Sequence, residues 1–203
     1  MKIFRYLIAI SFNPFLILRS IKKLPWFFFQ KYQFKKLLGN SNTSFEVMPF
    51  LFDHEEQAGL LNEYFWQDLL VAKKIIEKNP KKHIDIGSRI DGFISHLACV
   101  RKVEVLDIRP LSSVVENVKF TQWDINNPKE EFNYSSDCVS CLHTLEHLGL
   151  GRYGDKLDPD GWKKGLNSIS KLIAKSGQLW LSVPLGNEKI VFNAHRIFDP
   201  KTI

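Results

Sequence analysis

The sequence predicts an α/β domain with a mostly parallel sheet and helices on both faces, preceded by a basic, aromatic helical leader. From residue 62 onward, short β-type runs alternate with helical patterns, which is typical of the crossover units of a parallel sheet. Before that point the composition differs, because the first 45 residues hold eight Lys and Arg and no acidic residue. With 203 residues, 44% hydrophobic and 25% charged, the chain suits one ordinary globular domain with a small appendage.

The leader, residues 1–44, alternates apolar and cationic blocks and ends in a turn-rich polar segment at 39–44. Its eight cations leave 20 Lys and Arg against 22 Asp and Glu elsewhere, so the net charge of +6 belongs to the leader. A nucleic-acid groove on the main domain, residues 45–203, is therefore disfavoured. Two interpretations stay open: residues 1–38 lie on an anionic membrane surface, or they form helices that pack on the main domain. Three cysteines are too few for a disulfide framework, so we expect a cytoplasmic protein, peripheral on the membrane under the first interpretation.

The elements of the main domain can be placed in order along the chain. A helix is expected over 62–79, where Asn79-Pro80 ends the pattern, and another follows Asp160, which can cap it, with Gly177 as a left-handed exit. The apolar stripes of these two helices are Phe65, Trp66, Leu69, Leu70, Ala72, Ile75 and Ile76 in the first, and Trp162, Leu166, Ile169, Leu172 and Ile173 in the second. The expected strands are His83–Gly87, Val103–Asp107, Val118–Trp123, Cys138–Leu142 and Leu179–Val183, with a short helix over Phe93–Ala98.

Polar groups stand where several of these strands end, and ligands of parallel sheets bind beyond the carboxyl ends of the strands. Gly87, in the turn after the first strand, lacks the Cβ that would block a ligand, and helix N–H groups follow it. Asp107 comes 22 residues after Asp85, close to the spacing of an acid that accepts hydrogen bonds from ribose hydroxyls. Taken singly, Gly87 reads as a tight turn and Asp107 as a helix cap. Their joint spacing favours a nucleoside-containing ligand.

These residues resemble the class I S-adenosylmethionine-dependent methyltransferases. The turn Asp85–Gly92, the acid Asp107, Trp123-Asp124-Ile125 and the segment 137–147, with its Leu-Glu-His-Leu, occur in that family's order. The segments 150–155 and 195–200 are similar to the family catalogued as domain of unknown function 268. The resemblance covers about residues 60–203 and implies a Rossmann-like fold. Because the chain stops at Ile203, before the sixth and seventh strands of that fold would be complete, we expect a shortened sheet or a truncated version.

The resemblance also implies roles for individual residues. S-adenosylmethionine would be the cofactor, with Asp85, Gly87 and Ser88 at its methionine end. Asp107 would hold the ribose, Asp124 would bond the adenine amino group and Ile125 would pack on the ring. One departure is that Arg89 and Asp91 stand where the family has glycines, which could narrow the cofactor pocket.

Methyl transfer to a hydroxyl needs alignment of the reactants and a group that accepts a proton. His147 is the first choice for this base, with Glu146 and His143 as second choices, because an imidazole titrates near neutral pH. The alternative for His147 is a structural hydrogen bond at the strand end. The substrate side would be formed by Arg152, Tyr153, His195 and Arg196, with either arginine binding a phosphate or carboxylate. Family context suggests a glycan or another small hydroxyl-bearing acceptor, as in polysaccharide biosynthesis.

Two other classes of function remain alternatives. His143, Glu146 and His147 spell the H-x-x-E-H pattern of zinc peptidases, which requires a helix at 143–147 and a distant third ligand. A methyltransferase-like domain altered at Arg89 and Asp91 could instead be a non-catalytic interaction module. We expect no metal ion, and Cys138-x-x-Cys141 is expected to be buried packing because positions i and i+3 of a strand face opposite sides.

Overall fold

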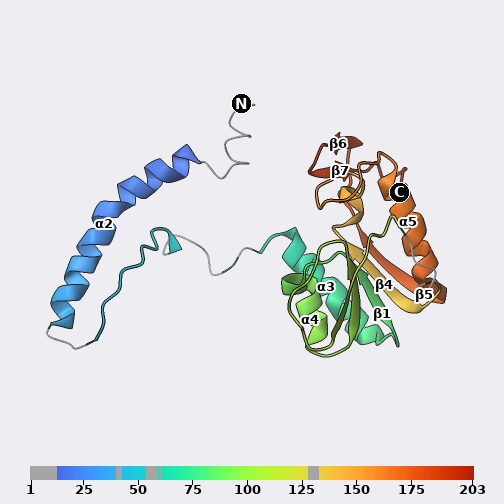
Figure 1. The fold of residues 1–203 in the computed structure, drawn as a ribbon, viewed down its shortest axis with the longest axis horizontal. Helices are drawn as coiled ribbons and strands as arrows, with labels where there is room; N and C mark the ends of the chain where they lie inside the picture. The colour runs from blue at the N-terminus through green and yellow to red at the C-terminus, as the bar shows by residue number, and fades with distance from the viewer. Residues whose placement is uncertain (1–12, 40–42, 54–58, 60, 128–132) are drawn as a thin grey trace. The chain divides into compact units, whose positions relative to one another are not determined.

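The computed structural model describes residues 13–39, 43–53, 59, 61–127 and 133–203. The chain divides into two compact units, Met1–Leu60 and Leu61–Ile203 (Figure 1). This division lies further along the chain than the boundary expected at 44. The reason is that the segment after the turn contacts the leader helix: the rings of Phe34 and Phe45 stack with their centroids 6.0 Å apart, and the Arg19 guanidinium lies 4.4 Å from the centroid of the Phe52 ring.

The first unit contains the helix α2, Pro14–Leu38. The side chain of Asn13 caps it by accepting a hydrogen bond from the Leu16 N–H at 3.1 Å, and proline in the first turn loses no helical hydrogen bond. All residues of α2 are described, and none of them is buried. Its Phe, Leu and Tyr side chains are therefore largely exposed, beside its lysines. The part of the leader expectation that concerns residues 1–12 lies outside the described residues. No described helix is long and apolar enough to cross a membrane.

The second unit is built on a five-stranded parallel sheet with the order β3-β2-β1-β4-β5, which confirms the Rossmann-like prediction. The strands are β1 His83–Ile86, β2 Val103–Asp107, β3 Val118–Gln122, β4 Ser136–Leu142 and β5 Ile173–Ser182. The chain moves outward from β1 to β3 and then returns to the other side of β1 as β4. The carboxyl ends of β1 and β4 therefore form the topological switch point, where ligands of such sheets bind.

Helices cover both faces of this sheet, as predicted (Figure 1). On one face lie α3 Glu63–Lys78, the π-helical turn η2 Ile90–Ile94 and α4 Ser95–Ala98; on the other lies α5 Gly161–Leu172. Strand residues alternate between two cores: Cys138 of β4 packs with α3, while Cys141 packs with α5. Both cysteines are buried and free, which confirms their expected packing role.

The stripe predicted for α3 is wider than the face that the helix buries. Val71, Ala72 and Ile75 are buried, whereas Trp66 and Leu70 are exposed. The helix packs on η2 and α4 along one arc only, so the apolar residues outside that arc face away from the core.

The expected end of α5 is wrong. The helix stops at Leu172 and β5 begins at once, so Gly177 lies inside the strand rather than in a left-handed cap. A Cβ at Gly177 would come within 2.9 Å of the Ser136 carbonyl oxygen, so this glycine is required by close backbone packing beside the bulge in β4. Asp160 occupies the N-cap position of α5, but its side chain pairs with Lys163 at 2.9 Å and makes no capping hydrogen bond.

The last described strands do not extend the main sheet. They are β6 Lys189–Val191 and β7 His195–Ile197, which pair with each other in a separate antiparallel sheet.

Candidate functional site

The carboxyl ends of β1, β2 and β4 open onto a cavity of about 700 Å³, within the range of about 300–1,000 Å³ that is usual for small-molecule sites. Three residues at the start of α3 that the sequence analysis missed, Glu63, Tyr64 and Asp68, also line it. Two of the predicted site residues, Asp85 and Arg196, do not line this cavity. The predicted site residues that the structure brings together around the cavity are Gly87, Ser88, Asp107, Asp124, Ile125, His143, Glu146, His147, Arg152, Tyr153 and His195.

Asp85 is completely buried beneath the turn that follows β1. Its Oδ1 accepts a hydrogen bond from the Ser88 N–H at 3.0 Å, and its Oδ2 accepts from the hydroxyls of Ser88 and Ser140. The carboxylate thus shapes the turn and joins β1 to β4. The sequence predicted that Asp85 contacts the cofactor directly. Because no part of its side chain is exposed, Asp85 instead positions the turn.

His83 extends this buried network. Its Nε2 lies 2.8 Å from the Ser140 hydroxyl oxygen, and because that hydroxyl donates to Asp85, Nε2 must be the donor. Among the described residues, the His83 Nδ1 has no hydrogen-bond partner. Burial lowers the pKa of His83 to about 3 and raises the pKa of Asp85 to about 7.

Gly87 is required by a contact within the protein. Its φ is +72°, and a Cβ would lie 2.6 Å from Cγ2 of Thr144. Gly87 still lines the cavity. A Cβ at this position would collide with Thr144, however, and not with a ligand in the cavity.

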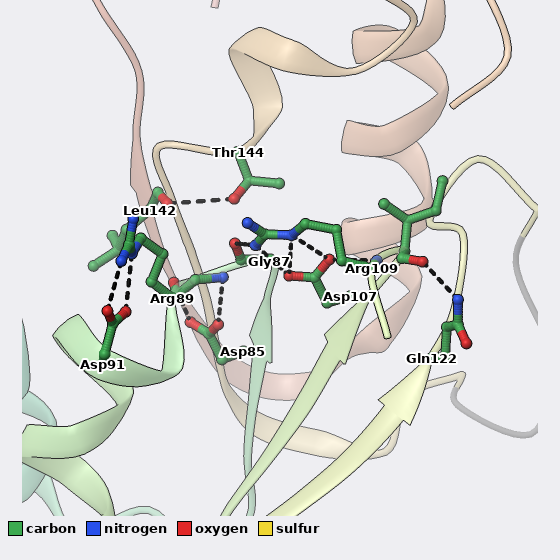
Figure 2. A network of polar contacts seen from close by, with 11 residues as sticks. Asp85, Gly87, Arg89, Asp91, Asp107, Arg109, Gln122, Leu142 and Thr144 are labelled. Carbon is green, nitrogen blue, oxygen red and sulfur yellow. Dashed lines mark hydrogen bonds and ion pairs between the residues drawn. The ribbon is translucent and has the colours of Figure 1, made fainter. Parts of the chain in front are cut away.

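Arg89 and Asp91 do not close the cavity, although the sequence raised that concern. The Arg89 Nε donates to Oδ1 of Asp91 at 2.9 Å, and the two side chains are 75% and 69% exposed (Figure 2). They form a surface pair at the rim. The helix that follows is broken by the non-helical backbone of Gly92, so the expected array of helix N–H groups is confined to η2 and the short α4.

Arg109 is the residue of this region that the sequence analysis missed. Its Nε donates to both oxygens of Asp107, at 3.0 and 3.2 Å, and its Nη2 donates to Oδ2 and to the Gly87 carbonyl oxygen, the latter at 3.1 Å (Figure 2). The Arg109 N–H adds a bond of 2.8 Å to Oδ1. Hydrogen bonding to this buried carboxylate raises the pKa of Arg109. The signal in the sequence was an arginine two residues after the end of a buried strand.

The next wall of the cavity follows β3. The Oδ1 of Asp124 accepts a hydrogen bond from the Asn126 N–H at 2.9 Å, which folds a tight turn. Ile125 and Trp123 are buried in the core on the α5 side, and Ile125 also lines the cavity. An acid and an apolar side chain thus stand side by side at this edge of the sheet.

Glu146, in the 3-10 turn η4 Leu145–His147, lies between two histidines. Its Oε1 is 3.9 Å from Nδ1 of His143 and 3.8 Å from Nε2 of His147, and its Oε2 has no hydrogen-bond partner among the described residues. The His147 Nδ1 lies 2.6 Å from the Ala194 carbonyl oxygen, so Nδ1 carries the proton and Nε2 faces Glu146. The Tyr64 ring packs edge-on against His143, with centroids 4.1 Å apart.

The electrostatics of this cluster favour Glu146 over His147 as a proton acceptor near neutral pH. Burial raises the pKa of Glu146 to about 7 and lowers the pKa of His147 to about 4. Burial also holds the pKa of His143 below its usual value. A carboxyl group that titrates near pH 7 beside two neutral imidazoles is suited to take up a proton from a hydroxyl.

Arg152 and Tyr153 lie on the loop 148–155, which borders the cavity. The buried Asp155 organises this loop, because its Oδ2 accepts hydrogen bonds from the N–H groups of Gly149 and Gly151, and its Oδ1 accepts from that of Tyr153. The guanidinium carbons of Arg109 and Arg152 lie 4.9 and 5.2 Å from the centroid of the Tyr153 ring. Two cations therefore share one aromatic ring at the cavity mouth.

Arg196, by contrast, does not face the substrate side. It is buried and donates to the carbonyl oxygens of Leu148 and Pro159, so it supports the loop 148–155 from behind. The substrate-binding role predicted for it is thereby corrected to a structural one. His195, its neighbour in β7, does line the cavity.

The geometry of residues 143–147 does not match a zinc-peptidase helix. The backbone of His143 is left-handed, with φ +55°, and only Leu145–His147 form a helical turn, of the 3-10 type. The two histidines are consequently not stacked one α-helical turn apart as the H-x-x-E-H pattern requires. Among the described residues, no group of three or more His, Cys, Asp or Glu side chains is arranged to hold a metal ion.

The fold and the site define a class of protein: a Rossmann-like α/β domain with a small-molecule cavity at the switch point of its sheet. The family model described as "Caenorhabditis protein of unknown function, DUF268" matches residues 101–202, half of the chain. The chain therefore belongs to this family, as its sequence motifs indicated. A search of curated protein sequences finds no match.

Several solved structures are similar in fold at low sequence identity. An amino pentose methyltransferase from Micromonospora echinaspora, with bound SAM, is 18% identical over 67% of this chain and 57% of its own, with a TM-score of 0.45. A 1,6-didemethyltoxoflavin-N1-methyltransferase from Burkholderia thailandensis, with bound S-adenosylhomocysteine, is 15% identical over 66% and 63%, with a TM-score of 0.47. A S-adenosylmethionine-dependent methyltransferase from Clostridium acetobutylicum is 15% identical over 59% and 50%, with a TM-score of 0.44. The chain thus spans between half and two thirds of the length of these structures.

The loop over the cavity can be tested with two glycines of the same backbone conformation. Gly149 has φ +79° and a Cβ there would lie 2.0 Å from the Asp158 carbonyl oxygen, whereas Gly154 has φ +83° and open space around it. We expect Gly149→Ala to lower the free energy of unfolding by about 3 kcal/mol, and Gly154→Ala by about 1 kcal/mol, because only the first adds a backbone clash to the left-handed strain. Urea unfolding measures both, and equal losses would contradict this account of the loop.

Proposed function

We propose that the chain is a S-adenosylmethionine-dependent methyltransferase that acts on a small hydroxyl-bearing acceptor. The observation that carries this proposal is that the turn after β1, Asp107 at the end of β2 and Asp124 after β3 border one cavity at the switch point. These are the positions, in the same order, by which the sequence resembles the class I methyltransferases.

The residues present fit an adenosine-bearing cofactor. Asp124 offers carboxylate oxygens, which can accept hydrogen bonds from hydroxyl and amino groups, and Asp107 does so where its oxygens are released by Arg109. Leu106 and Ile125 offer apolar surface beside them. Gly87 and Ser88 would border the opposite end of the cofactor. When bound, S-adenosylmethionine supplies an electrophilic methyl group on a sulfonium.

Glu146 is the residue that we assign as the general base. It lines the cavity, its carboxyl group has a pKa near 7, and its Oε2 is a buried atom without a partner among the described residues, which an acceptor hydroxyl would have to reach from the cavity. His147, the first choice from the sequence, donates through Nδ1 to the Ala194 carbonyl and would position Glu146. An acceptor hydroxyl that reaches Glu146 could lose its proton to this carboxylate.

For the acceptor we propose a glycan or a similar hydroxyl-bearing molecule, as in polysaccharide biosynthesis. A sugar hydroxyl requires a base of the kind that Glu146 provides. Arg152, whose guanidinium lies over Tyr153 at the same cavity, could pair with a phosphate or carboxylate on such a molecule.

We further propose that the protein is cytoplasmic and that its leader rests on an anionic membrane surface. Exposed Phe, Trp and Leu side chains beside the lysines of α2 suit the boundary between lipid headgroups and acyl chains. Such a position would hold the enzyme near lipid-linked acceptors.

The cofactor proposal is tested by calorimetry with S-adenosylhomocysteine. We expect the wild-type chain to bind it and Asp107→Asn to bind it roughly tenfold or more weakly, because a hydrogen bond to a charged acceptor contributes about 1.5–3 kcal/mol. Asp160→Asn, which changes an exposed acid at the start of α5, is the control and should bind like the wild type. Failure of the wild type to bind would favour the non-catalytic interaction module.

The raised pKa of Glu146 is tested without knowledge of the acceptor. Since its folded pKa, about 7, exceeds its ordinary value of 4.5, the fold favours the protonated carboxyl group. The associated stability is present below pH 4.5 and is lost as the pH rises through 7. Glu146→Gln, which mimics the protonated form, should therefore unfold like the wild type at pH 4.5 and be more stable at pH 8, by on the order of 3 kcal/mol. His143, His147 and Arg152 face this group and stay unchanged.

Glu116→Gln, at an exposed position, is the matched control and should show no such pH-dependent gain. In a methyl-transfer assay with sugar acceptors, Glu146→Gln should lose activity by roughly a hundredfold or more, the usual contribution of a general base. A stability difference that does not change between pH 4.5 and 8 would show that Glu146 titrates normally.

The membrane proposal is tested on the full chain by sedimentation with lipid vesicles. We expect binding to vesicles that contain phosphatidylserine but not to neutral phosphatidylcholine vesicles. Replacing the five lysines of α2 with glutamine should weaken binding at least tenfold, since each cation near an anionic surface contributes about 1 kcal/mol. The lysines are Lys22, Lys23, Lys31, Lys35 and Lys36. Equal binding of the variant and the wild type would overturn the proposal.

A further inference from the structure

The carboxylate of Asp107 is largely occupied by three N–H groups of Arg109. A carboxylate has about four lone-pair positions. Here Oδ1 accepts from the main-chain N–H and the Nε of Arg109, and Oδ2 accepts from Nε and Nη2. Asp107 is only 7% exposed, so little of the carboxylate is left for another donor. The two hydroxyls of a ribose would need the same oxygens that the guanidinium holds.

We propose that Arg109 is a gating residue of the nucleoside site: its guanidinium competes with ribose hydroxyls for Asp107 and must release this carboxylate before a ribose can bind. This inference rests on the proposed function. It adds a residue that competes with the ligand for the carboxylate. The main-chain N–H of Arg109 can keep its bond to Oδ1 while the side chain leaves.

A second cavity beside Asp107 could hold the Arg109 side chain after it leaves the carboxylate. Besides the main cavity, Arg109 and Asp107 border a second cavity of about 230 Å³, which is also lined by Asp91, Pro110 and Phe120. The side chain of Arg109 is 38% exposed, so its movement does not require the core to open. Asp91, now paired with Arg89, is a carboxylate on that side that a displaced guanidinium could share.

The other contacts of Arg109 hold it at the mouth of the main cavity. Its Nη2 bonds to the Gly87 carbonyl oxygen at 3.1 Å, and its guanidinium lies over the Tyr153 ring, with Arg152 over the same ring. The guanidinium thus joins the turn after β1 to the end of β2 (Figure 2). It also contacts Tyr153 of the loop 148–155. A ligand that replaces it must offer donors to Asp107 in return, because otherwise the buried carboxylate is left unpaired.

This competition affects only ligands with ribose hydroxyls. A ligand with both hydroxyls displaces the guanidinium and forms hydrogen bonds to Asp107 in its place. A dideoxy ligand has no donor for Asp107 and leaves the guanidinium paired with it. Removing the guanidinium should therefore improve the binding of ribose ligands and leave that of dideoxy ligands nearly unchanged.

The test is calorimetry on the full chain with three probes: S-adenosylhomocysteine, adenosine and 2′,3′-dideoxyadenosine. We expect Arg109→Met, which keeps the length of the side chain and removes its donors, to bind the first two roughly tenfold more tightly than the wild type does. The affinity for the dideoxy compound should change less than about twofold, since it has no donor for the freed carboxylate. Arg109→Lys, which keeps the charge but not the forked geometry, should lie between the two and serves if the methionine variant does not fold.

Lys119→Met is the matched control, because it removes a cation that pairs with Glu104, a buried acid of β2 that does not line the main cavity. It should bind all three probes as the wild type does. If S-adenosylhomocysteine binds the wild type and Arg109→Met equally well, or the variant more weakly, the gate is overturned and the proposed function stands. If neither protein binds any probe, the proposed function fails and the gate with it.

Discussion

The buried carboxylate of Asp85 is the interaction on which the rest of the site depends. With no exposed surface, it must be hydrogen-bonded within the protein, and it accepts bonds from Ser88 in the turn and from Ser140 in β4. These bonds fix the turn after β1 to the neighbouring strand at the switch point. Gly87 can then pass close to Thr144, and the cavity is bordered by a rigid edge of the sheet. Continuing the network, His83 keeps a neutral ring in the core.

The opposite wall of the cavity is held by polar contacts from two sides. Asp155 gathers main-chain N–H groups of the loop 148–155 from within, and Arg196 binds the Leu148 carbonyl from behind. Both side chains are buried, and both have their bonds to main-chain groups. This leaves the exposed Arg152 and Tyr153 as the groups that the loop presents to the cavity. The loop thus combines a fixed backbone with side chains suited to contact a ligand.

Two acidic side chains of the cavity, Asp107 and Glu146, each lie beside basic groups. The two acids differ in how their charge can become available. Asp107 is matched by Arg109, a group that stays charged, so only movement of the side chain can free the acid. Glu146 is matched by two imidazoles whose burial keeps them neutral, so its carboxyl group can change by taking up or losing a proton. The first pair suits recognition and the second suits acid–base chemistry.

Much of the fold was readable in the sequence, because period and spacing are local properties. The alternation of strands and helices predicted the parallel sheet, and the positions of Asp107, Asp124 and Glu146 at strand ends predicted that they would meet. The hydrogen-bond partners of the site residues could not be predicted in the same way. Asp85 and Asp107 are both acids at buried strands, yet one is sealed by serines and the other is held by Arg109, which the sequence leaves as an ordinary polar residue after a strand. Likewise, the sequence favoured His147 over Glu146 as the base from ordinary pKa values, whereas burial, which only packing creates, reverses their order. The sequence by itself determined that Asp107, Asp124 and Glu146 stand at or soon after the ends of strands. The tertiary structure decided which residues join them and which are buried, paired or open to a ligand, because desolvation and hydrogen bonding depend on neighbours that are distant in the chain.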